Sequence, residues 1–176
     1  MKKLLLIVFL IFFSWGFGQN LSLSELISLR SVGLETVEIY LTKKGWDFTY
    51  AEEEKGEELA SINFVYGSQG NFEHGESFIH RLYSSNGKNR LAIVLGKKTK
   101  YLEYLNAVRN FSPNTLFSGQ DKGDFMKIYQ GANNTFIFRT TTVKNPDGNS
   151  SSNWVITIMT NEDFEEESYK VSLNKK

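Results

Sequence analysis

Two histidines and a glutamate form the cluster in this sequence that is most typical of catalysis or metal binding. His74, Glu76 and His80 all have even numbers, so one continuous strand would place them on the same face. Imidazole and carboxylate groups in that arrangement could ligate a metal ion or act as an acid–base pair. Gly75 and the loop before it argue against a continuous strand from residue 74. The cluster therefore supports an alternative hypothesis, a small metal-dependent or His/Glu hydrolase, and is a weak candidate for a metal site.

The rest of the sequence carries no recognised catalytic or cofactor motif. It has no G-x-S-x-G, no H-E-x-x-H and no phosphate-binding glycine loop. The acidic runs at 52–58 and 162–167 are typical of solvated loops and helix ends. Asp121, Asp124 and Asp147 do not fit the spacing of a calcium-binding loop. We therefore expect no cofactor and favour binding over catalysis.

A second group of candidate residues would lie on the exposed face of a β-sheet. If helices cover only one face, the alternating strands present tyrosine, threonine and basic side chains on the other. Tyrosine and arginine are enriched in binding hot spots, although β-propensity also favours tyrosine and threonine on any sheet. The expected partner-binding residues are Arg81, Tyr83, Arg90, Tyr129 and Arg139, with Lys127, Thr141 and Thr157 on the same face. They predict a site for a protein or peptide partner.

Local signals predict three helices that would cover the other face. We expect one after Ser22, a second over about 34–44 and a third over about 100–110. Ser22 and Glu25 have the S-x-x-E spacing of a capping box, and Gly45 suits the C-terminal end of the second helix. Thr99 is expected to cap the third.

Alternation of polar and apolar residues predicts strands after each helical region. They are expected at 46–50, 61–66, 78–85, 88–95, near 116–117, and at 125–130, 135–143 and 154–160. Residues 67–76 and 145–149 are expected to be loops.

The clearest local signal is a hairpin around Asn86-Gly87, the preferred pair for a two-residue type I′ turn. Such a turn places Leu82 opposite Leu91 and His80 opposite Ile93. The predicted core face is Phe78, His80, Leu82, Leu91, Ile93 and Leu95, and the other face is Ile79, Arg81, Tyr83, Arg90, Ala92 and Val94.

The order of helix, strands, helix, strands predicts an internal repeat with halves of about 22–97 and 98–165. Lys55-Gly56-Glu57 matches Lys122-Gly123-Asp124 at an offset of 67, and each leads into an aromatic-rich strand. The predicted fold class is α+β: two helix-plus-antiparallel-strand units form one meandering antiparallel sheet, with helices packed on one face. In element order this architecture resembles the β-lactamase-inhibitor-protein-like folds. The resemblance carries no residue motif and implies no activity.

The N-terminus is typical of a cleavable secretory signal peptide. Lys2 and Lys3 precede an apolar run over 4–13, which is too short to span a bilayer, and Gly16 and Gly18 suit a cleavage site. We expect residues 1–18 to be the signal peptide and 19–176 to form a single α+β domain. The protein would then be exported, to the periplasm or the extracellular space.

Composition narrows the partner class. The sequence has no Cys, so it has neither a disulfide framework nor the lipid-accepting residue of a lipoprotein. Lys plus Arg and Asp plus Glu number 20 each, which gives no support for nucleic-acid binding. No second apolar stretch predicts a membrane span. The oligomeric state does not follow from the sequence.

Overall fold

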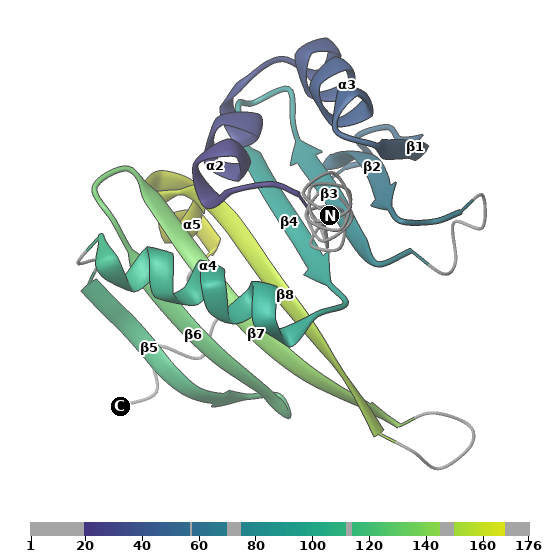
Figure 1. The fold of residues 1–176 in the computed structure, drawn as a ribbon. Helices are drawn as coiled ribbons and strands as arrows, with labels where there is room; N and C mark the ends of the chain where they lie inside the picture. The colour runs from purple at the N-terminus through teal and green to yellow at the C-terminus, as the bar shows by residue number, and fades with distance from the viewer. Residues whose placement is uncertain (1–19, 57, 70–74, 112–113, 145–149, 168–176) are drawn as a thin grey trace, which may run out of the picture.

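The computed structural model describes residues 20–56, 58–69, 75–111, 114–144 and 150–167 (Figure 1). These residues form four helices and eight strands. The helices are α2 (Leu23–Ser31), α3 (Leu34–Lys43), α4 (Lys98–Asn110) and α5 (Asn161–Glu167). The strands are β1 (Trp46–Glu52), β2 (Ala60–Tyr66), β3 (Ser77–Tyr83), β4 (Asn89–Leu95), β5 (Asn114–Asp121), β6 (Asp124–Gln130), β7 (Asn134–Lys144) and β8 (Ser150–Thr160).

All eight strands belong to one antiparallel sheet, in the order β1-β2-β3-β4-β8-β7-β6-β5. The prediction of an α+β fold with a large antiparallel sheet is therefore confirmed. Strands β1–β4 form one meander and β5–β8 another, and the two meet where β4 pairs with β8. In consequence β1 and β5 are the outer edges. Gly56 and Gly123 lie in the first turn of each meander, both with positive φ (+61° and +94°).

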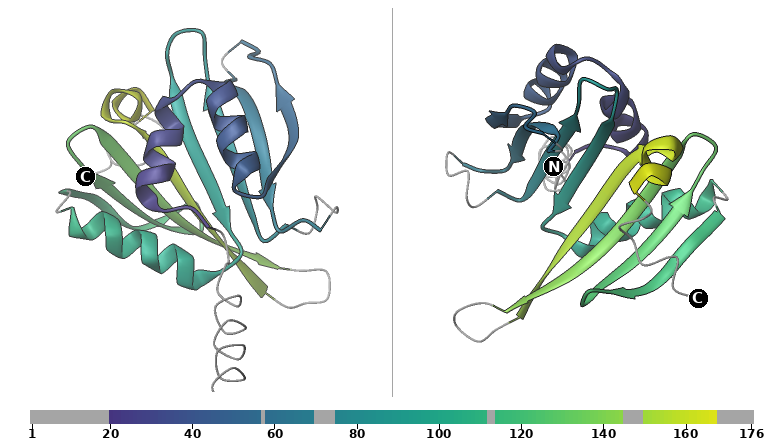
Figure 2. Two further views of the ribbon diagram at one scale, coloured as in Figure 1. Left: turned by 45° about the horizontal axis from the view of Figure 1, so that its top comes forward. Right: turned by 180° about the vertical axis from the view of Figure 1, so that it is seen from behind.

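Three of the helices cover one face of the sheet, and the fourth lies on the other (Figure 2). Leu26 of α2, Val37 of α3 and Tyr104 of α4 are buried in a single core with the side chains of the strands beneath them. In contrast, Phe164 of α5 packs with Met126, Ile128 and Met159 in a separate cluster. The prediction that helices occupy only one face is wrong in this respect. We call the face that carries α5 the open face.

The β3–β4 hairpin is out of the predicted register by one residue. Leu82 pairs with Arg90, and Ile79 with Ile93. Gly87 has a φ of +90°, whereas Asn86 is not among the residues with positive φ, so a type I′ turn is excluded. Instead the backbone N–H of Gly87 donates to Ser84 O, which makes a three-residue loop with Gly at the left-handed position.

This slip exchanges the faces of β3, because neighbouring residues of a strand point to opposite sides. The side chains of β3 beneath the helices are Ser77, Ile79, Arg81 and Tyr83, while Phe78, His80 and Leu82 point to the open face. On β4 the predicted division is correct: Leu91, Ile93 and Leu95 are buried in the main core.

The predicted helix signals are confirmed at α2 and α3 but not at α4. Ser22 and Glu25 form a reciprocal capping box, and Gly45 follows α3 with a φ of +81°. Helix α4 begins earlier than predicted: Lys97 is its N-cap and makes no side-chain capping bond. The assignment of Thr99 as a cap is therefore wrong.

Candidate functional site

The open face contains a hollow of about 560 Å³ over β4, β8 and β7. Thr157 lies at the centre of this region, because it pairs with Ala92 on one side and with Ile137 on the other. The lining residues are Leu82, Arg90, Ala92, Asp121, Lys122, Asp124, Ile137, Arg139, Thr141, Val155, Thr157, Met159 and Phe164. The hollow thus combines an aliphatic floor with charged and hydroxyl groups.

Elements distant in sequence close the hollow at its borders. Phe164 comes from α5, and Asp121, Lys122 and Asp124 come from the β5–β6 turn. Lys122 and Gly123 of that turn both have positive φ, +50° and +94°. The site is therefore assembled from both meanders and the last helix.

The two arginines of the hollow are held very differently. Arg90 makes a bidentate pair with Asp163 of α5, with Nε–Oδ2 and Nη2–Oδ1 distances of 2.7 Å each. Both side chains of this pair are largely buried, at 13% and 5% exposure. Arg139 is 47% exposed, and its Nε lies 3.7 Å from Oδ2 of Asp124. Arg139 is thus freer than Arg90 to reach a bound molecule.

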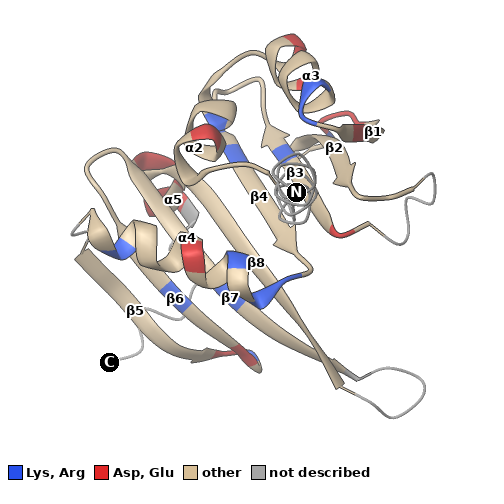
Figure 3. Ribbon diagram, viewed as in Figure 1, with Lys and Arg blue, Asp and Glu red and all other residues tan. Residues whose placement is uncertain are grey.

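Charged residues of both signs are interspersed along the chain (Figure 3). Around the hollow, Arg139 and Lys122 are accompanied by Asp121 and Asp124. The mixture gives no single-sign field to attract a ligand of one charge.

The structure places half of the predicted open-face residues as expected. Arg90, Arg139, Thr141 and Thr157 all line the hollow. Lys127 instead pairs with Phe138 of the main core, so it lies on the helix-covered side. Tyr129 is buried in that core, and Tyr83 packs against it. The predicted placement of these three residues on the open face is wrong.

The predicted placement of Arg81 is also wrong, because its side chain is only 2% exposed beneath α2. Its Nε donates to Leu29 O near the end of α2, and its Nη1 donates to the carbonyls of Leu82 and Arg90. Burial, together with the charge of Arg30, lowers the pKa of Arg81 to about 10. These contacts fix α2 to the sheet and leave Arg81 unable to touch a partner.

The structure does not unite the described members of the histidine cluster. His74 lies outside the described residues. Glu76 precedes β3 and forms a 3.0 Å ion pair with Lys97. His80 points to the open face and hydrogen-bonds through Nδ1 to Oδ1 of Asn63, and burial lowers its pKa. Among the described residues no group of three His, Asp or Glu side chains could hold a metal ion.

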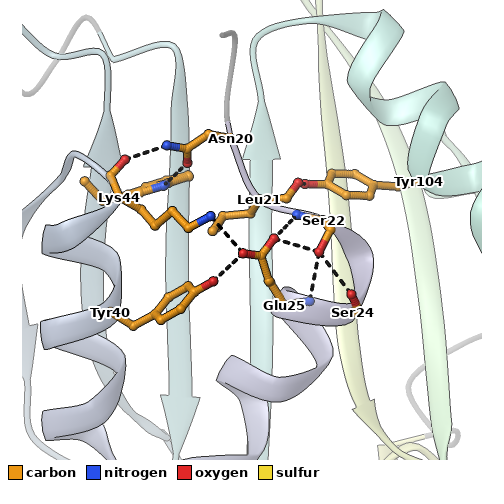
Figure 4. A network of polar contacts seen from close by, with 9 residues as sticks. Asn20, Leu21, Ser22, Ser24, Glu25, Tyr40, Lys44 and Tyr104 are labelled. Carbon is orange, nitrogen blue, oxygen red and sulfur yellow. Dashed lines mark hydrogen bonds and ion pairs between the residues drawn. The ribbon is translucent and has the colours of Figure 1, made fainter.

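A second polar network lies between α2 and α3 (Figure 4). The Glu25 carboxylate accepts hydrogen bonds from the backbone and hydroxyl of Ser22 and from the Tyr40 hydroxyl, and pairs with Lys44 Nζ at 2.9 Å. A smaller pocket of about 280 Å³ adjoins it, lined by Ser24, Glu25, Ser28, Leu29, Val32, Thr36 and Tyr40. Through Tyr40 and Lys44 on one side and Ser22 on the other, Glu25 connects the end of α3 to the start of α2.

Comparisons with family models, with curated proteins and with solved structures gave no match. In the described part of the chain, no helix has the length and apolar character required to cross a bilayer.

Proposed function

We propose that this protein is a non-catalytic binding module that holds a protein or peptide partner in the hollow of the open face. We also propose that residues 1–18 direct its export, and that it acts in the periplasm or outside the cell without a lipid anchor. The single observation that carries the binding proposal is the hollow itself, about 560 Å³ in volume. That size lies within the range of about 300–1,000 Å³ found for ligand sites.

The lining of the hollow supports a side chain of a partner as its occupant. Ile137, Val155 and Met159 provide apolar surface at its floor. A buried anchor side chain surrounded by polar groups is the usual arrangement of a binding hot spot. Arg139, loosely held by Asp124, is the group best placed to form a hydrogen bond or an ion pair at the border.

The proposed origin of the hollow is the union of two similar units, each a helical region followed by four strands. The strand order supports this proposal, because β4 and β8 end the two meanders and lie side by side. The same order underlies the proposed resemblance to the β-lactamase-inhibitor-protein-like folds.

A peptide-display selection against the immobilised full chain would test the binding proposal. The informative variant is Thr157→Trp, since an indole at the centre of the hollow would fill it. The matched control is Thr42→Trp, at an exposed position on α3 on the other side of the sheet. Arg139→Gln tests whether the arginine at the border of the hollow contributes to peptide binding. Circular dichroism would establish that each variant is folded.

We expect selected peptides to bind wild type and Thr42→Trp alike. Thr157→Trp should weaken binding by at least about tenfold, or about 1.4 kcal/mol. Arg139→Gln should weaken it less, by about threefold to tenfold. Selection of no peptide, or equal binding by wild type and Thr157→Trp, would refute the proposal for this face.

A further inference from the structure

The outer strand β5 presents an unusually unprotected edge. It runs from Asn114 to Asp121, and none of its residues before Asp121 is charged. Figure 3 shows β5 without a charged residue along most of its length. Its outer side has no partner strand among the described residues. Natural proteins usually protect such edges with charges, because free backbone groups invite another strand.

The opposite edge, β1, supplies a comparison within the same molecule. It carries Asp47 and Glu52, one near each end, and a bulge between Phe48 and Tyr50. Strand β5 also has a bulge, between Thr115 and Phe117, but it leaves the segment after Phe117 regularly paired with β6. Only β1 therefore combines a bulge with charges at both ends.

Large apolar side chains beside β5 are exposed as well. Leu116 of β5 is 39% exposed, Phe125 of the adjacent β6 is 43% exposed, and Phe111 at the end of α4 is 65% exposed. Phe125 pairs with Gln120, and its other neighbour is Thr140 of β7. Exposed apolar surface next to a free strand edge is typical of an interaction site.

We propose that β5 pairs antiparallel with β5 of a second copy of this chain, which joins the two sheets into one. The pairing is isologous: a twofold axis perpendicular to the sheet keeps both helix layers on the same side. The apolar side chains of one copy, beside β5, would then meet those of the other. An isolated peptide could add a strand to the edge but would bring no second layer to cover Phe111, which favours a second copy.

The sequence of β5 is compatible with pairing to itself. If Ser118 lies on the twofold axis, Asp121 faces Thr115 of the other copy, and no two carboxylates are opposed. The hollow of the open face and this edge share one residue, Asp121, which the variants below leave unchanged. The inference does not rest on the proposed function.

Sedimentation equilibrium of the full chain, expressed with its own N-terminal segment, tests the inference. We expect reversible dimerisation. Ser118→Lys should weaken it at least about tenfold, because the two lysines would face each other across the axis. Gln120→Lys, also exposed, is a second variant of the same edge. Tyr50→Lys, at an exposed position of β1, is the matched control and should leave dimerisation unchanged.

Circular dichroism and thermal melting would show that the three variants fold. A monomer at all concentrations up to about 1 mM overturns the inference. So does a dimer that Tyr50→Lys disrupts and Ser118→Lys does not, or one that neither Ser118→Lys nor Gln120→Lys weakens. Binding of a foreign extended peptide at β5 by a chain that stays monomeric would likewise overturn it.

Discussion

Replacing Glu25 by Gln should destabilise the protein and remove part of its acid sensitivity. The Glu25 carboxylate joins the start of α2 to the end of α3, through Ser22, Tyr40 and Lys44 (Figure 4). Gln keeps the size of the side chain and can still act in a capping box, but the substitution removes the charge and one of the two acceptor oxygens.

The pKa of Glu25 sets an upper limit for the effect. Partial burial raises this pKa, but the hydrogen bonds from Ser22 and Tyr40 and the contact with Lys44 outweigh it and bring the value from 4.5 to about 2. In a fully buried site a change of that size would correspond to about 3 kcal/mol. The side chain is 26% exposed, and solvent weakens its interactions. We therefore expect a loss of about 1–2 kcal/mol at pH 7.

The pH dependence follows from the direction of the change. Because the pKa is lower in the folded state, the unfolded state binds the proton first, and ionised Glu25 stabilises the fold fully above about pH 4.5. That contribution should disappear as the pH falls from about 4.5 to about 2. In Glu25→Gln this part of the acid dependence should be absent.

Urea unfolding at a series of pH values measures both effects. Glu38→Gln, an exposed carboxylate on α3, is the control and should change the free energy of unfolding by less than about 0.5 kcal/mol. A double-mutant cycle with Tyr40→Phe should give a coupling energy of at least about 0.5 kcal/mol. If Glu25→Gln matches wild type in stability and in acid dependence, the Glu25 network does not stabilise the contact between α2 and α3.

Further predictions concern α5, the β3–β4 hairpin and the open face. Asp163→Asn breaks the buried pair with Arg90 and should lower the free energy of urea unfolding by about 3 kcal/mol; retention of full stability would contradict the pairing. Gly87→Ala places a Cβ on a residue with a φ of +90° and should cost about 1–2 kcal/mol in thermal unfolding. His80 should titrate below pH 6.5 by NMR, and the fold should lose stability as the pH falls from 6.5 towards that lower pKa. A normal His80 titration would show that its ring is not buried.

Local signals in the sequence are sufficient to predict most of the helices and strands. They do not predict the register of the β3–β4 hairpin, which determines which side chains lie on the open face. The S-x-x-E pattern placed α2 correctly, and alternation located the strands of both meanders. The pair Asn86-Gly87 suits both a two-residue type I′ turn and a three-residue loop in which Gly alone has positive φ. Only the second occurs, and it moves Arg81 from the open face to the layer beneath α2. A single-residue change in loop length thus moves two predicted binding residues, Arg81 and Tyr83, away from the open face.

Helix α5 could not be predicted from periodicity, because it is short and acidic and contains one large apolar residue. That residue, Phe164, is buried on the open face, and its neighbour Asp163 is held by Arg90 of β4. The pairing partner lies 73 positions away in the sequence, so no local pattern could reveal it. The acidic run over 162–167 predicts solvated side chains, and this prediction is wrong for Asp163, which is buried.

The same long-range contact explains why several residues of the hollow can be predicted from the sequence, whereas the hollow itself cannot. Arg139, Thr141 and Thr157 could be assigned to an exposed sheet face from strand alternation alone. A hollow requires borders as well, and these come from α5 and the β5–β6 turn, which are distant in sequence from β4 and meet it only in the folded chain. Because Asp163 ties α5 to Arg90, disruption of that pair should loosen one border and leave the floor intact. Partner binding should therefore be more sensitive to Asp163→Asn than the strand content of the fold is. A larger loss of partner binding than of strand content would distinguish a binding site on the open face from an ordinary sheet surface.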